Sequence, residues 1–260
     1  PHSHHSIRDV KVKDGQELSY NEILKICNWL NFKTNNKVFK GSMDYIQNGY
    51  DETNDAVNKI IEIALKNNKT YILGIGAITN IALAIKKEPQ IVNKIEIIWL
   101  GGNELGYIDN LEYNFRQDVE AVKIVFESEV KLTILPCKNI VSELRIDINT
   151  LKKYLKNKSE LCNYLIERFY NDGYHGIQES RVIWDISVIA YMINKNWFEI
   201  NEEQFWLYKD IAKYFKKYSK YYWSTYISIY FDSFFQFIDL IYYFDMFENF
   251  EKFNSMDSNN

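Results

Sequence analysis

Short apolar runs rich in β-branched residues alternate with longer segments of helical period through the middle of this chain. Three such runs stand at residues 70–75, 94–100 and 131–135, each next to a segment whose apolar residues recur every three or four positions. Strands of a parallel sheet that is covered on both faces read as continuous apolar runs. The alternation therefore predicts an α/β fold with a mostly parallel, doubly wound sheet, in which residues 70–75 form a buried central strand.

The two ends of the chain give weaker signals. Before the first run we expect a strand at residues 7–12, a turn at Asp14-Gly15, a helix from the capping box at residues 19–22 to about Leu30, and a brief strand at residues 38–39. Other predicted helices cover residues 56–64, 118–127, 151–170, 182–193 and 203–217, and a strand at residues 225–230 precedes a final aromatic helix. We expect one domain over residues 1–253, with extra C-terminal helices, and a disordered polar tail over residues 254–260.

Composition excludes some partners. The chain has 31 basic and 35 acidic residues, a formal charge of −4, so it lacks the positive surface that proteins use to bind nucleic acid phosphates. No stretch approaches the roughly 20 uninterrupted apolar residues of a membrane span. Its three cysteines, Cys27, Cys137 and Cys162, are far apart, which indicates buried free thiols in a reducing compartment such as the cytoplasm.

A polar loop follows the second apolar run. It begins at Gly101-Gly102 and reaches Asn114, and its acidic and amide residues are Asn103, Glu104, Asp109, Asn110, Glu112 and Asn114. Because α/β proteins bind ligands at the carboxyl ends of their parallel strands, this loop is a candidate binding site.

Four segments carry a family resemblance; residues 10–21, which contain Gly15-Gln16, give the weakest signal, and the other three match longer motifs. Residues 74–82 read GIGAITNIA, residues 112–121 read EYNFRQDVEA, and residues 182–191 read VIWDISVIAY. In the same order they are similar to the T-G-P-L-T-N-I-A, E-F-N-x-x-x-D-P-E-A-A and H-D-P-x-A-V-A-Y motifs of the inosine-uridine preferring nucleoside hydrolases. The resemblance implies a Rossmann-like fold, a homo-oligomer (dimer or tetramer), and hydrolysis of the N-glycosidic bond of ribonucleosides to ribose and free base.

The resemblance also implies how a nucleoside would be held. Glu112 and Asn114 would bind ribose hydroxyls, since a carboxylate can accept from two neighbouring hydroxyls at once, and Gln16 stands where the family has a sugar-binding asparagine. Trp184 replaces the histidine that helps to protonate the base, and it would stack on the base or belong to the core. His175, in a glycine-flanked segment, is a weak candidate for the acid or an ordinary surface histidine.

The implied cofactor is calcium, held by the backbone carbonyl of Ile75 and the carboxylate of Asp185. Family members begin with a D-x-D-x-x-x-D-D cluster that also binds this ion, and no such spacing occurs in this sequence. Calcium takes six to eight oxygens, so two positions do not complete a site.

Three interpretations of this incomplete site stay open. The sequence is an incomplete version of an active enzyme, a diverged homologue that binds a nucleoside or sugar without hydrolysis, as a binding or oligomer subunit, or a hydrolase-like fold with an unrelated role.

Overall fold

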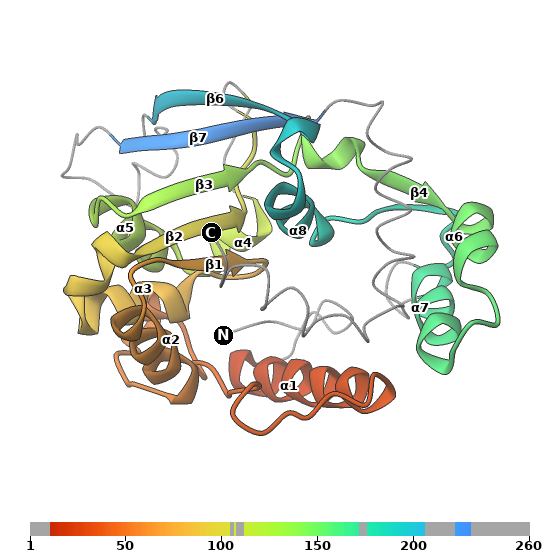
Figure 1. The fold of residues 1–260 in the computed structure, drawn as a ribbon, viewed down its shortest axis with the longest axis horizontal. Coiled ribbons are helices and arrows are strands. Elements are labelled where there is room, and N and C mark those ends of the chain that lie inside the picture. The colour runs from red at the N-terminus through yellow and green to blue at the C-terminus, as the bar shows by residue number, and fades with distance from the viewer. Residues whose placement is uncertain (1–10, 105–106, 108–111, 172–175, 206–221, 230–260) are drawn as a thin grey trace.

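A computed structural model describes residues 11–104, 107, 112–171, 176–205 and 222–229 (Figure 1). Its main sheet has the order β1-β2-β3-β7-β6. The first four of these strands run parallel, and β6 pairs with β7 in the antiparallel sense. Their bounds are β1 Thr70–Gly74, β2 Ile95–Leu100, β3 Lys131–Leu135, β6 Phe198–Phe205 and β7 Tyr222–Ile229. This architecture confirms the predicted α/β class with a mostly parallel sheet.

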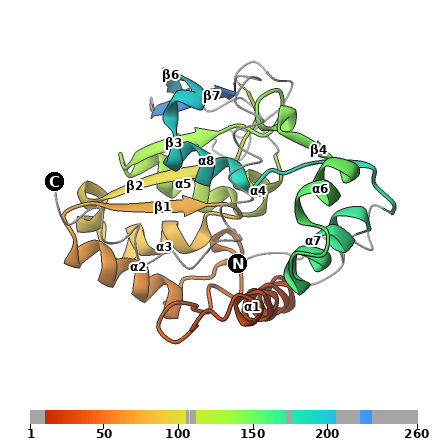
Figure 2. The same cartoon turned by 45° about the vertical axis from the view of Figure 1, so that its right-hand side comes forward.

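Helices connect these strands and extend beyond them. Helices α2 and α3 lie below β1 in Figure 2, whereas α8 lies in front of the sheet. A second, antiparallel pair of strands, β4 Arg145–Asp147 and β5 Ser180–Val182, leads to a helical extension of α6 and α7. The helices are α1 Val12–Trp29, α2 Asp55–Lys66, α3 Thr79–Lys87, α4 Tyr113–Gln117, α5 Val119–Glu127, α6 Ile148–Leu155, α7 Glu160–Tyr170 and α8 Ile186–Ile193, with 3₁₀ turns η1 Ile46–Asn48, η2 Pro89–Lys94, η3 Val141–Glu143 and η4 Lys195–Trp197. Every helix in these described ranges is too short or too polar to cross a bilayer.

Strand β2 is buried on both faces and divides the core in two. Because side chains alternate along a strand, Ile97 and Trp99 pack with residues of α2, α3 and α5, whereas Ile98 and Leu100 pack with residues of α8. Each of these β2 side chains is at most 2% exposed. Helices on both sides of one parallel sheet give the doubly wound arrangement that the apolar runs predicted.

Strand β1 is not the buried central strand that we expected. Within the described residues it pairs only with β2, at one edge of the sheet, and Tyr71 and Leu73 are 43% and 40% exposed. Its apolar composition identified a strand correctly, but composition alone does not distinguish an edge strand from an inner one.

The predictions for the amino-terminal part were wrong in detail. Helix α1 begins at Val12 and continues through Asp14-Gly15, where a turn was expected, and through residues 19–22, where its capping box was expected. Gly15 is buried inside this helix, and its N–H donates to the Lys11 carbonyl at 2.9 Å, so packing has overridden the local turn signal. Residues 38–39 form no strand, and residues 7–10 lie outside the described ranges.

Downstream the outcomes are mixed. The helices expected at 56–64 and 118–127 and the strand at 225–230 are confirmed as α2, α5 and β7. The helix expected over 151–170 is two helices, because Ser159 caps α7 after a break. The helix expected from 182 begins at Ile186, and Glu203 lies in strand β6 instead of a helix. Residues 206–217, the final helix and the tail at 254–260 lie outside the described residues.

Helix α1 reaches across to α7, beside which it lies in both ribbon views (Figures 1 and 2). The indole N–H of Trp29 donates to Glu160 Oε2 at 3.0 Å, and the Trp29 and Tyr164 rings have centroids 4.9 Å apart. Tyr164 also donates its hydroxyl hydrogen to Glu22, and the Lys25 ammonium lies 3.9 Å from the centre of the Tyr164 ring. These aromatic and charged contacts join α1, near the start of the described chain, to α7.

Asp118 ties three elements together at the start of α5. Its side chain is completely buried and accepts from the backbone N–H groups of Ile46, Gln47 and Ala121 and from the hydroxyl of Thr79, at 2.9, 3.2, 3.3 and 2.6 Å. These donors belong to η1, α5 and α3. A buried carboxylate is stable only when donors compensate its lost hydration, and here four do so.

Replacing this hub should cost stability. We expect Asp118→Ala to lower the free energy of unfolding by roughly 3–5 kcal/mol, because several donors lose a charged acceptor inside the core. Thr79→Val removes one of the four bonds and keeps the side-chain shape, so about 1–2 kcal/mol is expected for it. Urea titration followed by circular dichroism measures both, and an Asp118→Ala variant as stable as Thr79→Val would contradict the role assigned to Asp118.

Candidate functional site

The ends of β1 and β2 are held together by the indole of Trp99. Its Nε1–H donates to the Gly76 carbonyl at 2.9 Å, and its ring stacks on Phe115 with centroids 4.6 Å apart and planes 4° apart. A Cβ on Gly74 or Gly101 would come within 2.7 or 2.9 Å of the Trp99 ring. Only glycine allows this close approach, so both strand ends are fixed against the same aromatic side chain.

Glu112 caps α4 beside these strand ends. Its Oε2 accepts from the backbone N–H groups of Gly102, Asn114 and Phe115 at 3.1, 2.9 and 3.2 Å. Burial raises the pKa of the Glu112 carboxyl, and these three N–H groups and the Cys137 thiol lower it by less. The carboxylate is therefore held firmly by the backbone, and three of its donors share one of its two oxygens.

Asn114 follows in the first turn of α4 and is 7% exposed. Its amide Nδ2 donates to the carbonyl of Leu100, the last residue of β2, at 2.8 Å. This bond orients the side chain at the carboxyl end of the sheet and leaves Oδ1 as its remaining acceptor.

Asp185 is the residue just before α8, and its carboxylate is not used to cap that helix. The residue is exposed, and no hydrogen bond or ion pair holds its side chain among the described residues. The surrounding protein nevertheless raises the pKa of Asp185 to about 6, first by desolvation and second by the negative charge of Glu112. The structure thus brings Glu112 and Asp185 close enough for their charges to repel.

Cys137 lies beside both carboxylates. It is 8% exposed, and its backbone N–H donates to the Gly102 carbonyl at 2.8 Å. Burial, and after it the negative charge of Glu112, raise the pKa of its thiol. The sequence indicated only a buried free thiol here, which the structure confirms. Its place near Glu112 was missed, although its position shortly after a predicted strand, at the carboxyl edge of a parallel sheet, was an available signal.

The structure shows fewer contacts that connect the other candidate residues with Glu112 and Asp185. Trp184 is half-buried and packs against the core cluster under α8, next to Asp185. Ile75 follows β1 directly and is 49% exposed. Gln16, in α1, is 6% exposed with an unpaired Oε1, and no bond joins it to Glu112 or Asp185. His175 lies outside the described residues.

The residues that the structure describes do not complete a calcium site. No group of three or more histidine, cysteine, aspartate or glutamate side chains there could hold a metal ion. The Asp185 carboxylate and the Ile75 carbonyl offer two oxygens, against the six to eight that calcium takes. These two oxygens are therefore too few to hold a calcium ion without further ligands.

Polar residues of the first sequence motif have structural partners. Thr79 donates to Asp118, and Asn80 Oδ1 accepts from both the N–H and the hydroxyl of Ser42, at 2.9 and 2.8 Å. A Cβ on Gly41 would come within 2.7 Å of the Asn80 amide. These residues anchor the turn after β1 and are not free to meet a ligand.

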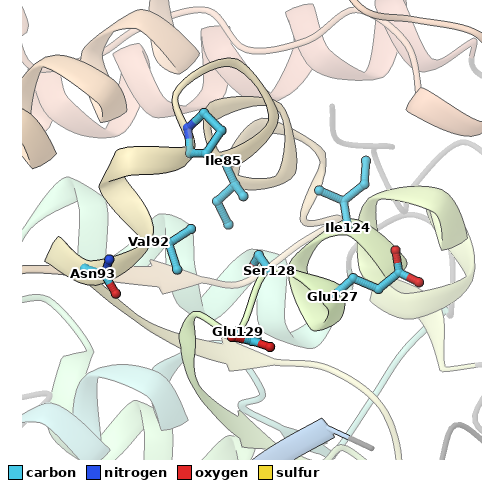
Figure 3. A pocket seen from close by; sticks show the side chains of 8 residues that line it. Ile85, Val92, Asn93, Ile124, Glu127, Ser128 and Glu129 are labelled. Atoms are coloured by element: carbon cyan, nitrogen blue, oxygen red, sulfur yellow. The ribbon is translucent and has the colours of Figure 1, made fainter. Parts of the chain in front are cut away.

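A separate hollow of about 490 Å³ lies between the carboxyl ends of α3 and α5 (Figure 3). Apolar Ile85, Val92 and Ile124 and acidic Glu127 and Glu129 line it. Since η2 and residues 128–130 lead directly into β2 and β3, this hollow is at the amino end of those strands. It is at the opposite end of the sheet from Glu112 and contains none of the candidate residues.

The mostly parallel sheet with helices on both faces defines an α/β protein, with Glu112 and Asp185 at the carboxyl edge of its sheet. The family model described as "Inosine-uridine preferring nucleoside hydrolase" matches residues 11–228. The chain belongs to this family.

Sequence similarity to named nucleoside hydrolases supports this membership. The chain is 28% identical to a probable ribonucleoside hydrolase of Dictyostelium discoideum over 156 residues, which are 56% of this chain and 46% of that protein. It is 34% identical to the inosine-uridine preferring nucleoside hydrolase of Crithidia fasciculata over 156 residues, 54% of this chain and 47% of that protein. The aligned region spans about half the length of these curated relatives.

A solved structure supports the fold. The inosine-uridine preferring nucleoside hydrolase of Bacillus anthracis superposes with a TM-score of 0.56 at 18% sequence identity, covering 74% of this chain and 66% of that chain. At this identity the likeness shows a shared fold.

The raised pKa of Glu112 predicts how stability depends on pH. Its folded pKa lies above the ordinary value of 4.5, so the folded chain holds this proton more tightly than the unfolded chain. Ionisation of Glu112 therefore reduces stability as pH rises from 4.5 through the folded pKa. Glu112→Gln removes the charge, keeps an oxygen acceptor and relieves the repulsion on Asp185.

We expect the thermal midpoint of Glu112→Gln, relative to that of the wild type, to rise as pH increases from mildly acidic to neutral. Differential scanning calorimetry at several pH values measures this difference. Glu143→Gln, on an exposed side chain, is the matched control and should show no such trend. A Glu112→Gln difference that stays constant with pH would contradict the prediction.

Proposed function

We propose that this chain binds the ribose of a nucleoside at the carboxyl edge of its sheet and takes part in hydrolysis of the N-glycosidic bond. The observation that carries the proposal is the Glu112 carboxylate, which the backbone holds rigidly beside the accessible carboxylate of Asp185. Glu112 and Asp185 stand in the segments that resemble the family's motifs, and both fall within residues 11–228, which the family model matches.

Ribose has neighbouring hydroxyls, and a fixed carboxylate can accept from two of them. Glu112 would do so, and the Oδ1 of Asn114 would add an acceptor at the same edge. Trp184, half-buried beside Asp185, offers an apolar ring face for the base. Glycosidic cleavage develops positive charge on the sugar ring, which nearby carboxylates favour. Gln16 stays a prediction of the resemblance that no described contact supports. His175 stays a prediction from the sequence and lies outside the described residues.

One observation favours a second candidate function, binding without hydrolysis. The described residues hold no cluster that could bind a metal ion, and cleavage needs an activated water as well as a bound sugar. Calcium at Asp185 and Ile75 and a dimeric or tetrameric assembly stay predictions, to be checked by calcium titration and analytical ultracentrifugation of the chain.

Binding and hydrolysis can be measured separately. We expect calorimetry to detect inosine or uridine binding and Glu112→Ala to weaken it about 10- to 100-fold, the loss typical of hydrogen bonds to a charged group. Incubation of the same samples with calcium, followed by an assay for free ribose, tests hydrolysis. Glu143→Ala, at an exposed position, is the control.

Each outcome separates the alternatives. Ribose release that Glu112→Ala abolishes supports the hydrolase function. Binding without release supports the second candidate. Absence of binding by a folded wild-type chain overturns both.

A further inference from the structure

The indole of Trp99 packs against two backbone segments that lead to Glu112. One contains Gly101, where an added Cβ would meet the Trp99 ring at 2.9 Å and the Phe115 ring at 3.0 Å. The other contains Phe115, whose ring stacks on the indole with planes 4° apart. Trp99 and Phe115 are 0% and 2% exposed, so neither ring can move without disturbing a close-packed core.

Both segments carry donors to the Glu112 carboxylate. Phe115 supplies one of the three backbone N–H groups that bond Glu112 Oε2, and Gly102, the neighbour of Gly101, supplies another. Helix α4, which contains Phe115, has only five residues and contributes little order of its own. A shift of either segment would move a donor, so the direction of the carboxylate depends on the stack of Trp99 on Phe115.

The indole is anchored separately to the end of β1. Its Nε1–H donates to the Gly76 carbonyl at 2.9 Å, and a Cβ on Gly74 would meet the ring at 2.7 Å. Core packing on this face of β2 does not by itself require an indole, because Ile97 is equally buried there with an aliphatic side chain. One ring thus connects the end of β1 with the backbone around Glu112.

We propose that Trp99 is a positioning residue, whose ring acts through Phe115 and Gly101 to direct the Glu112 carboxylate toward the hydroxyls of a bound sugar. The role of the sugar rests on the proposed function above, whereas the placement of Glu112 by Trp99 does not.

Four variants separate positioning from packing. Trp99→Leu removes the stack and the indole bond, and Phe115→Leu removes the stack alone and carries the test if Trp99→Leu does not fold. Trp99→Phe removes the indole bond but keeps an aromatic ring against Phe115, so it is the conservative variant. Trp29→Phe is the matched control, because it removes an indole bond to Glu160 in the contact between α1 and α7. Thermal midpoints report the packing cost of each variant.

Amide hydrogen exchange, followed by NMR, needs no ligand. The N–H of Gly102 is protected by its bond to Glu112, whereas the amides of β2 and β3 are protected by the sheet. We expect Trp99→Leu and Phe115→Leu to speed exchange at Gly102 roughly tenfold more than in those strands, the upper value for one lost aromatic pair. A loss of overall stability would speed all these amides together. Trp99→Phe should restore most of the protection, and Trp29→Phe should leave it unchanged.

Calorimetry with inosine and uridine measures the effect on binding. Trp99→Leu and Phe115→Leu should each weaken binding roughly tenfold, and Trp99→Phe should bind nearly as the wild type does. In a Glu112→Ala background the two leucine substitutions should cause no further loss, because they act through that carboxylate.

The outcomes distinguish this inference from the proposed function. Exchange at Gly102 that rises only in step with β2 and β3 would overturn the positioning role. So would an affinity that is unchanged by the leucine variants, or a loss that persists undiminished in the Glu112→Ala background. If exchange responds as expected but the folded wild type binds neither nucleoside, the role of Trp99 in placing Glu112 is supported and the proposed function is overturned.

Discussion

A half-buried glutamate, Glu112, that accepts from three backbone N–H groups determines the shape of the candidate site. Helix α4 has five residues, too few to be stable alone, so its position depends on what holds its ends. Glu112 holds the first end, and the fully buried Asp118, which bonds four donors, holds the other. Two carboxylates thus fix the segment that presents Asn114 and Phe115 to the strand ends.

Hydrogen-bond satisfaction separates the structural residues of the motifs from those that can meet a ligand. Thr79, Asn80 and Asp118 belong to motif segments, yet their described bonds are to other parts of the same chain. Asp185 is exposed, no hydrogen bond to another described residue holds its side chain, and its carboxyl carries an elevated pKa beside Glu112. Elevated carboxyl pKa values are common at functional sites, because such sites place charges where the fold alone would not.

Much of the fold could be predicted from the sequence where burial imposes a pattern. The runs of β1, β2 and β3 were identified because continuous apolar segments leave few alternatives. The start of α1 and the strand around Glu203 were not, since local turn and helix signals there were overridden by partners distant in sequence. Glu112, Asn114 and Asp185 stood in motifs, whereas Cys137 stands in none of them, and its place near Glu112 depends on how the ends of β2 and β3 meet in the tertiary structure.

The contact between α1 and α7 has a consequence for the order of folding. Trp29 and Glu160 are 131 positions apart in the chain, so their hydrogen bond closes a long loop. The entropy of closing such a loop must be overcome before the contact contributes any stability, whereas the β1 to β3 unit forms from neighbours in sequence. We therefore expect the α1–α7 junction to assemble late and to be the first part of the described chain to exchange its amide hydrogens with solvent.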